Sequence, residues 1–294
     1  MRVAALAALA IAPPPVAHAA RILAVQSSDA PRLVRALSAL RERAGIPVDV
    51  VRLSEVREDA LESTLGKADR QTIVVALGPR ASDFLVQLPS PVPVVHCLAG
   101  AEAMRAGLPA IPSEVPAEQH AAWLRQLVPA ARTVGLAYDP ATNTRHAEAA
   151  AASLSVAGYR TLLAPVSTPS ALPAALEQLA ARRVDVLLAL PDGTVYTRES
   201  ARGILLHSFR KRMPVIGPND AWVRMGALYA LDWNYDEVGA TCAQLALRVL
   251  LAAKVPEALP SPPRPRVSVN LKAAAQFGLQ WDPGLLRTVD IRHE

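Results

Sequence analysis

The stretch that decides the fold is VDVLLALPDGTVYTRESARGILLHSFRKRMPVIG, Val184 to Gly217. An apolar run ends in a polar turn, Pro191–Thr194, and a helical segment leads from this turn to a second apolar run. This order predicts two parallel strands joined by a helix. Open α/β sheets bind their ligands at the carboxyl ends of such strands. The turn is therefore a candidate ligand-binding corner.

The same alternation of strands and helices extends over most of the chain. Further strands are predicted at Arg21–Gln26, Val48–Leu53, Ile73–Gly78, Val92–Cys97, Thr133–Tyr138, Tyr159–Val166 and Ala227–Asn234. Between Leu98 and Glu118 the pattern lapses, and three prolines exclude a regular helix there. We interpret this segment as a crossover between two lobes. The predicted fold class is α/β, with two Rossmann-like lobes of parallel sheets joined by a hinge.

This crossover sets the predicted domain boundaries. The first lobe takes residues 21–116 and the second takes residues 117–234. A helix from Tyr235 to Ala253 carries one apolar stripe, and the segment 235–262 is predicted to return to the first lobe. A last strand, Arg266–Asn270, and the tail, 263–294, are predicted to join the second lobe. The proline-rich stretch VPEALPSPPRP before this strand is predicted to be a stiff extended connector.

Residues 1–20 read MRVAALAALAIAPPPVAHAA and resemble a secretory signal peptide. Arg2 precedes an apolar run, and Ala17-His18-Ala19 supplies a cleavage pattern that predicts a cut after Ala19 or Ala20. The run is shorter than the roughly 20 residues that cross a bilayer. The mature protein is predicted to be soluble and periplasmic, and an uncleaved N-terminal anchor is the alternative.

Composition and charge exclude several classes of protein. The chain has 294 residues, of which 51% are hydrophobic and 19% charged, so it has enough apolar material for one or two cores. The net charge is +5, but the basic residues are scattered and aromatic residues make up only 4%. A nucleic-acid-binding protein concentrates basic charge on one face beside stacking aromatics. No nucleic-acid partner is therefore expected.

The two cysteines, Cys97 and Cys242, allow one disulfide in an oxidising compartment. Cys97 ends an apolar strand and Cys242 lies on an apolar helix stripe. Two separately buried thiols are the alternative that we favour.

No catalytic or metal-binding motif is present in the sequence. There is no P-loop, no G-x-G-x-x-G and no G-x-S-x-G, and the six histidines form no H-E-x-x-H. We therefore predict no enzyme activity, no catalytic residue, no metal and no cofactor.

Polar residues follow the predicted strands at their carboxyl ends, which face one edge of a parallel sheet. The candidate ligand-binding residues are Ser27, Ser28, Gly78, Arg80, Ala81, Tyr138, Asn143, Thr144, Asp192, Gly193, Thr194, Asn219, Asp220, Asp232 and Trp233. Asp192 or Asp232 is predicted to pair with a ligand ammonium, and Arg80 or Arg145 with a carboxylate. For each residue alone, helix capping is the competing interpretation.

Four blocks in order resemble the ABC-transporter substrate-binding family that includes tryptophan- and tyrosine-binding members. They are VGLAYDPATNT, VDVLLALPDGTVYTRESA, PVIGPNDAWVRMGALYALDWNYDEVGATCAQLALRVL and VSVNLKAAAQFGL, between Val134 and Leu279. The resemblance implies the type I periplasmic binding protein fold. It also implies ligand contacts from the Asp139–Thr144 turn, from Asp192-Gly193-Thr194 and from Asn219-Asp220, and the Gly78–Ser82 turn matches the family's turn after the third strand.

The expected function is capture of a small, amino-acid-like molecule between the lobes and its delivery to an inner-membrane ABC permease. Closure of the lobes by a hinge motion is expected on binding. The protein is expected to be a monomer. The alternatives are a ligand-sensing subunit that signals to a membrane sensor kinase, and an enzyme that uses a cleft carboxylate such as Asp192.

Overall fold

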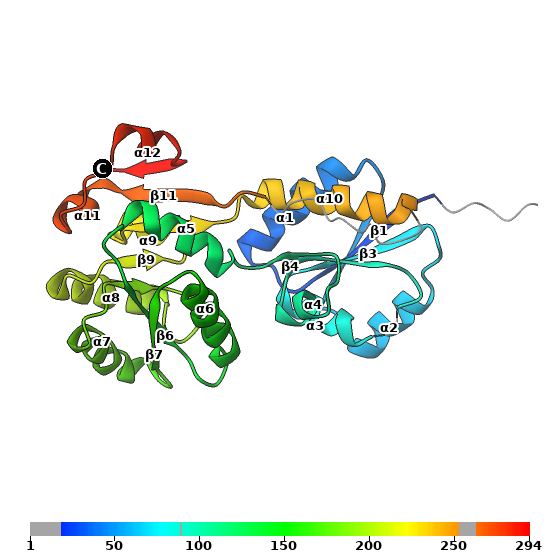
Figure 1. Cartoon of the computed structure of the whole chain (residues 1–294). Helices are drawn as coiled ribbons and strands as arrows, with labels where there is room; N and C mark the ends of the chain where they lie inside the picture. The colour runs from blue at the N-terminus through cyan, green and yellow to red at the C-terminus, as the bar shows by residue number, and fades with distance from the viewer. Residues whose placement is uncertain (1–18, 89, 253–262) are drawn as a thin grey trace, which may run out of the picture.

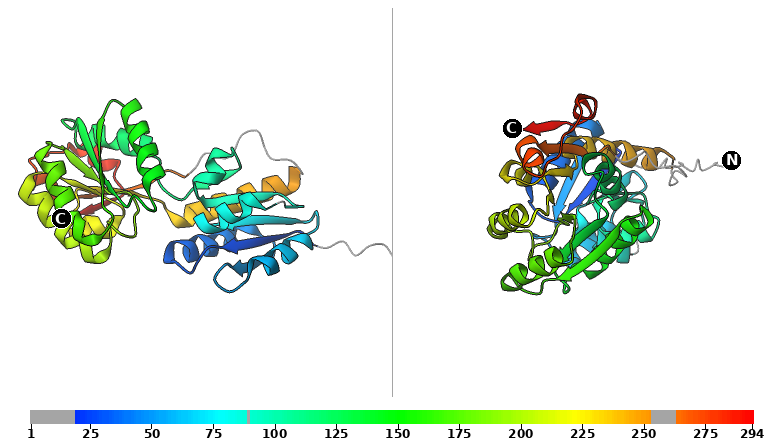
Figure 2. Two further views of the ribbon diagram at one scale, coloured as in Figure 1. Left: turned by 90° about the horizontal axis from the view of Figure 1, so that it is seen from below. Right: turned by 60° about the vertical axis from the view of Figure 1, so that its left-hand side comes forward.

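The computed structural model describes residues 19–88, 90–252 and 263–294. Nearly all of the predicted signal peptide, and most of the proline-rich connector, lie outside the described residues. Figure 1 shows two α/β lobes that lie side by side along the long axis of the molecule, and Figure 2 shows the same two bodies from below.

The first lobe is built around one parallel sheet. Among the described residues its strand order is β2-β1-β3-β4-β5. Its elements are β1 (Arg21–Gln26), α1 (Pro31–Ala44), β2 (Val48–Arg52), α2 (Glu58–Gly66), β3 (Thr72–Leu77), α3 (Pro79–Gln87), β4 (Val94–Ala99), α4 (Ala101–Arg105), β5 (Ala110–Pro112) and α10 (Tyr235–Ala252).

Side-chain alternation along the strands divides the core of this lobe into two layers. In β1, Ile22 and Ala24 join the cluster formed with α1 and α10. Leu23 and Val25 point to the other face and join the cluster formed with α2 and α3. Because successive strand residues face opposite sides, the apolar run of β1 needs helices on both faces.

Helix α10 lies against α1 on one face of the first sheet, although some 190 residues separate the two in sequence (Figure 1). Gly239 makes this close approach possible, since a Cβ at this position would lie 2.1 Å from the carbonyl oxygen of Ala36. Glycine therefore sets the distance between the two helices.

A disulfide between Cys97 and Cys242 ties α10 to β4, with 6.1 Å between the two Cα atoms. The favoured expectation of two separate buried thiols is wrong. Each cysteine does lie at a fully buried position. The packing of α10 over the sheet makes those two positions neighbours, which the separate strand and helix patterns do not show.

The crossover segment between Leu98 and Glu118 contains more regular structure than expected. Helix α4 and the short edge strand β5 both form there. The helix ends at Arg105, before the first proline of the segment, and Pro112 is the last residue of the edge strand. Proline is compatible with both places, since an edge strand tolerates a missing N–H.

The second lobe has a longer sheet. Among the described residues its strand order is β12-β11-β10-β9-β8-β6-β7. Its elements are α5 (Ala117–Leu127), β6 (Thr133–Tyr138), α6 (Thr144–Val156), β7 (Arg160–Pro165), the 3-10 turn η1 (Pro169–Ala171), α7 (Leu172–Ala181), β8 (Val186–Leu188), α8 (Arg198–Lys211), β9 (Val215–Gly217), α9 (Asp220–Met225), β10 (Tyr229–Asp232), β11 (Arg266–Asn270), α11 (Leu271–Gln276), α12 (Pro283–Arg287) and β12 (Ile291–His293).

The end of the chain completes this second sheet. Strand β11 pairs antiparallel with β10, and β12 pairs parallel with β11. After the predicted strand Arg266–Asn270, the tail thus holds two short helices and a second strand. The chain passes between the lobes after Pro112 and again after Asp232, before α10 begins at Tyr235.

Candidate functional site

A cavity of about 1300 Å³ lies between the two lobes. It is bounded by the first turn of α1 in the first lobe, by the connecting segments, and by the carboxyl ends of β8, β9 and β10 in the second lobe. The lining residues are Ala30, Pro31, Arg32, Ser113, Glu114, Val115, His120, Thr142, Asn143, Ala189, Leu190, Pro191, Asp192, Gly193, Thr194, Tyr196, Pro218, Asn219, Asp220, Ala221, Trp222, Arg224, Leu231, Asp232, Trp233 and Tyr235.

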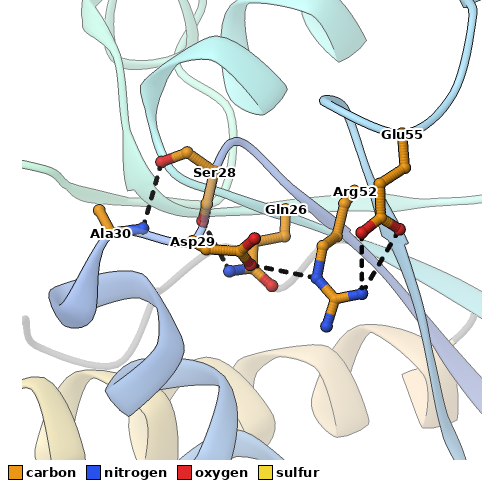
Figure 3. A network of polar contacts seen from close by, with 6 residues as sticks. All are labelled: Gln26, Ser28, Asp29, Ala30, Arg52 and Glu55. Atoms are coloured by element: carbon orange, nitrogen blue, oxygen red, sulfur yellow. Dashed lines mark hydrogen bonds and ion pairs between the residues drawn. The ribbon is translucent and has the colours of Figure 1, made fainter.

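The corner between β1 and α1 carries most of the first-lobe part of the lining, to which Tyr235 of α10 adds. Figure 3 shows how polar contacts fix this corner. Gln26 donates through Nε2 to the Ser28 carbonyl oxygen at 2.6 Å, and the Ala30 N–H donates to the Ser28 hydroxyl at 3.4 Å. Arg52 at the end of β2 donates to Asp29 at 3.1 Å and also contacts Glu55. The start of α1 is thereby positioned against the cavity.

Asp192 organises the opposite wall. One carboxylate oxygen accepts from the N–H groups of Thr194 and Val195, each at 2.8 Å. The other oxygen accepts from the Asp139 N–H at 2.8 Å and from Asn143 Nδ2 at 2.6 Å. The turn after β8 is therefore joined to the turn after β6.

These contacts change the role expected for Asp192. Burial opposes ionisation of its carboxyl, but the four hydrogen bonds lower its pKa. The carboxylate already accepts four hydrogen bonds from its own chain, so it shapes the corner, and a ligand ammonium would have to compete with these donors.

Asp220 and Asn219 are also engaged by their own chain. Asp220 contacts His293 Nε2 at 2.7 Å and Arg224 Nη1 at 3.1 Å. The Asn219 side chain accepts from the Trp222 N–H and caps α9. Both residues line the cavity, but their side chains also have the structural role that capping residues commonly have.

Asp232 lies at the end of β10, where the chain leaves the second lobe. Its Oδ1 accepts from the Trp233 N–H at 2.8 Å and from the Tyr235 hydroxyl at 2.7 Å. Burial raises its pKa, and the hydrogen bonds together with the charges of Arg266 and Arg32 act in the opposite direction. Arg32 also lowers the pKa of Tyr235 through its charge and a hydrogen bond, against the larger raising effects of burial and Asp232.

His120 lines the connecting side of the cavity, and His146, which is not a lining residue, contacts the lining residue Glu114. Glu114 contacts His146 Nε2 at 2.6 Å and, with the more distant Asp192, raises the pKa of His146 against the effect of burial. Burial, assisted by His146, lowers the pKa of His120 to about 4, so His120 is neutral near pH 7. Its Nδ1 has no hydrogen-bond partner among the described residues.

Four aromatic residues supply apolar surface: Tyr196, Trp222, Trp233 and Tyr235. Tyr196 and Trp222 meet edge to face with ring centroids 5.9 Å apart. Trp233 is only 3% exposed, and its indole Nε1 has no partner within the described structure. A buried indole N–H usually has an acceptor, so this group is an unused donor beside the cavity.

A model of the ABC transporter substrate binding protein family matches residues 64–290. The chain belongs to this family. No curated protein matches this substrate-binding protein. Members of the family are binding proteins rather than enzymes, as the resemblance noted in the sequence implies.

Three solved structures resemble this substrate-binding protein across nearly its whole length. A Streptococcus pneumoniae ABC domain in complex with L-Trp has 14% identity and a TM-score of 0.65, covering 94% of this chain and 100% of the other. A ligand-free, open substrate binding protein from Clostridium difficile has 16% identity and a TM-score of 0.71, with the same coverage of 94% and 100%. A conserved domain protein from Vibrio cholerae has 19% identity and a TM-score of 0.62, again covering 94% and 100%.

These similarities confirm the predicted fold class, the two-lobed type I periplasmic binding protein fold. None of the described helices combines the length and apolar character that a membrane span requires. Within the described residues, no group of three or more His, Cys, Asp or Glu side chains is placed to hold a metal ion.

The structure brings eight of the predicted site residues together around the cavity. They are Asn143, Asp192, Gly193, Thr194, Asn219, Asp220, Asp232 and Trp233. The other seven are not among its lining residues: Ser27, Ser28, Gly78, Arg80, Ala81, Tyr138 and Thr144.

Most of those seven have identifiable structural roles. Ser27 accepts the Ala81 N–H at 2.9 Å and so joins the corners after β1 and β3. Tyr138 is buried in the core of the second lobe. The Thr144 hydroxyl donates to the Pro140 carbonyl oxygen at 2.8 Å.

The two arginines expected to take a carboxylate lie outside the lining. Arg80 is exposed in the first turn of α3. Arg145 is exposed and contacts Glu102 of the first lobe at 3.7 Å.

Several lining residues carry no sequence signal that marks them as such. Arg32 is one of four arginines on an ordinary amphipathic helix, Glu114 lies in the crossover segment, and His120 lies in the first turn of α5. Only the return of α10 to the first lobe, which places Tyr235 beside Arg32, shows that these residues share one cavity.

Proposed function

We propose that this protein captures a small solute between its lobes, closes on it, and presents the closed form to an ABC permease. The observation that carries the proposal is the inter-lobe cavity of about 1300 Å³, which is lined from both lobes and from the segments that connect them. Ligand pockets typically occupy about 300–1,000 Å³. A hinge motion that brings the lobes together would reduce the open cavity to that range.

Residues of both lobes would then contact the solute. The corners after β8, β9 and β10 supply Thr194, the backbone around Gly193, and Trp233. Closure would bring the corner between β1 and α1, with Ser27 and Ser28, toward the solute from the other side. A ligand that contacts both lobes favours the closed form by its differential affinity for that form.

We propose that the mature protein acts in the periplasm as a soluble monomer. The leader sequence of residues 1–20 supports export. The Cys97–Cys242 disulfide supports it independently, because disulfides persist in oxidising compartments and are rare in the cytosol. Cell fractionation, N-terminal sequencing and size-exclusion chromatography test this: the expected first residue is Ala20 or Arg21 and the expected mass is that of one chain.

The test of solute capture is direct. Protein purified from its natural host under native conditions is denatured, and the released small molecules are identified by mass spectrometry. Each candidate is then added back to ligand-free protein, and small-angle X-ray scattering measures the radius of gyration. A saturable decrease is expected for the true solute, together with loss of its uptake in cells that lack the gene. A library of amino acids, peptides, sugars and organic acids that leaves the scattering unchanged would contradict capture by closure.

A further inference from the structure

Hydrogen-bond donors with spare capacity remain at the cavity, on Arg32 and on the Trp233 indole. Each of the four carboxylates among the lining residues already has a partner of its own chain: Glu114 has His146, Asp192 has four N–H groups, Asp220 has His293 and Arg224, and Asp232 has Tyr235 and the Trp233 N–H. A ligand ammonium that enters the cavity must compete with these contacts. A ligand acceptor would meet less competition at Arg32 and at the Trp233 indole, because these donors have few or no partners in the chain.

Arg32 is the principal donor with spare capacity. It is half-buried in the first turn of α1 and lines the cavity. Within the described residues it forms no ion pair, whereas Arg35, one turn further along the same helix, pairs with Asp236. Its contact with the Tyr235 hydroxyl engages only part of a guanidinium that has five N–H groups.

The backbone at the start of α1 adds to this donor set. Ala30 occupies the N-cap position and offers no side-chain cap, and Pro31 has no N–H. The N–H of Arg32 has no hydrogen-bond partner in the described structure. This one free N–H, at the amino terminus of a 14-residue helix, favours a negative charge nearby.

Trp233 provides an independent observation. Trp233 lines the same cavity and is only 3% exposed, and its buried indole N–H has no partner among the described residues. A buried donor without an acceptor costs roughly 1–3 kcal/mol. An acceptor brought by the ligand would remove this cost.

We propose that the cavity takes a small organic acid, with a carboxylate and no neighbouring ammonium, and that Arg32 anchors the carboxylate. The α1 amino terminus adds electrostatic support, and the Trp233 indole donates to an acceptor of the ligand. The aromatic residues around the cavity suit a partly apolar body. This inference rests on the proposed function, since it names the class of solute for the same cleft.

Two sets of probes, each with one apolar body and different polar head groups, test the inference. The first set is 3-phenylpropanoate, L-phenylalanine, 2-phenylethylamine and 3-phenylpropanamide. The second set is 4-methylpentanoate, L-leucine and 3-methylbutylamine. Succinate and myo-inositol extend the range to a dicarboxylate and a neutral polyol. Isothermal titration calorimetry and the indole N–H signals in a ¹⁵N correlation spectrum of the full mature chain report binding.

The expected result is saturable binding of at least one acid, with a shift of the Trp233 indole signal, and binding at least roughly tenfold weaker for its amine, amide and amino-acid counterparts. Arg32→Gln should weaken acid binding roughly tenfold or more, and Arg32→Lys should restore part of it because the charge returns without the planar fork. Trp233→Phe should weaken it several-fold. Arg41→Gln, the same change at an exposed position of the same helix, should leave affinity unchanged.

Three results would overturn the inference: none of the acids binds, an amino acid or amine binds as tightly as the matched acid, or acids bind Arg32→Gln as tightly as the wild type. Circular dichroism and thermal melting establish that each variant is folded. If amino acids or myo-inositol instead close the lobes in scattering experiments, the binding function stands and the acid preference falls. If no compound closes the lobes, the proposed function itself fails.

Discussion

Asp139 and Asp192, at the ends of the neighbouring strands β6 and β8, secure each other's turns. The Asp139 N–H donates to Asp192 at 2.8 Å, and the Asp139 carboxylate accepts the hydroxyl of Thr194, two residues beyond Asp192, at 2.7 Å. Two acidic residues that the sequence offers as ligand contacts thus hold the wall of the cavity in shape.

We expect Asp192→Asn to destabilise the second lobe. An amide keeps only one acceptor oxygen, so two of the four donors to Asp192 lose their partner. The free energy of unfolding should fall by about 1–3 kcal/mol, as measured by urea denaturation. Asp49→Asn removes an exposed ion pair with Arg21 and should change stability by less than about 1 kcal/mol. Equal effects of the two substitutions would contradict the structural role of Asp192.

The pH dependence of stability should carry the signature of Asp192. Because its pKa is lower in the folded than in the unfolded protein, its contribution is present above the ordinary pKa of an aspartate and is lost as pH falls through the lower folded value. Urea denaturation at a series of pH values below 5 should show a steeper loss of stability for the wild type than for Asp192→Asn. Parallel curves would show that Asp192 is not preferentially ionised in the fold.

The buried histidines His96 and His120 should make the protein less stable as pH falls from about 6.5 to about 4. Burial lowers the pKa of each to about 4, so between these values the unfolded chain binds protons that the folded chain does not. Each histidine contributes up to about 1.4 kcal/mol per pH unit to this slope. His120→Leu should reduce the slope, and histidine ring signals in NMR should show no titration of either residue above about pH 5. Titration of His96 or His120 near pH 6.5 would refute the prediction.

Removal of the disulfide should destabilise the protein substantially. Cys97 and Cys242 are 145 residues apart, and cross-links that close long loops restrict the unfolded chain most. The Cys97→Ala/Cys242→Ala double variant should lose about 2–5 kcal/mol of unfolding free energy. A reducing agent should lower the melting temperature of the wild type and leave that of the double variant unchanged. Two titratable thiols in the denatured, unreduced protein would disprove the cross-link.

Gly239→Ala should force α10 away from α1. The added methyl group would overlap the backbone of Ala36 and Leu40, which cannot move as a flexible side chain can. We expect a loss of about 1–3 kcal/mol in the free energy of unfolding. The control is Gly203→Ala in α8, where nothing lies within 4 Å and alanine should stabilise the helix by up to about 1 kcal/mol. Similar stability changes of the same sign would contradict the close helix contact.

The sequence predicts the fold well where one element produces one strong pattern. Strands such as Arg21–Gln26 and Thr133–Tyr138 are found at the predicted residues, because a buried parallel strand reads as a short apolar run. Helix α10 begins at its predicted residue, Tyr235, and is helical as far as the described residues reach, because its apolar stripe repeats over about three turns. Short elements such as β5 and β12 have three residues each, too few to establish a period.

The site is harder to predict, because a polar residue at a strand end can cap the next helix or contact a ligand, and the sequence looks the same in both cases. Asn219 caps α9 and Asp192 ties two turns together, while both also line the cavity. The role of Arg32 and the disulfide are hard to predict from the sequence for a different reason. Each depends on where α10 lies relative to the first lobe, and local sequence patterns do not give the distance between elements far apart in the chain.

The routes of α10 and β11 have a consequence for biosynthesis. The first sheet lacks one of its covering helices until residue 252 has been made, and β10 lacks its antiparallel neighbour until residue 270 has been made. The nascent chain therefore cannot complete one lobe before it begins the other, as a chain of independent domains can. Both mature together near the end of translation, so the nascent polypeptide stays incompletely folded for most of its synthesis, the condition in which a translocation channel that threads unfolded chains can accept it.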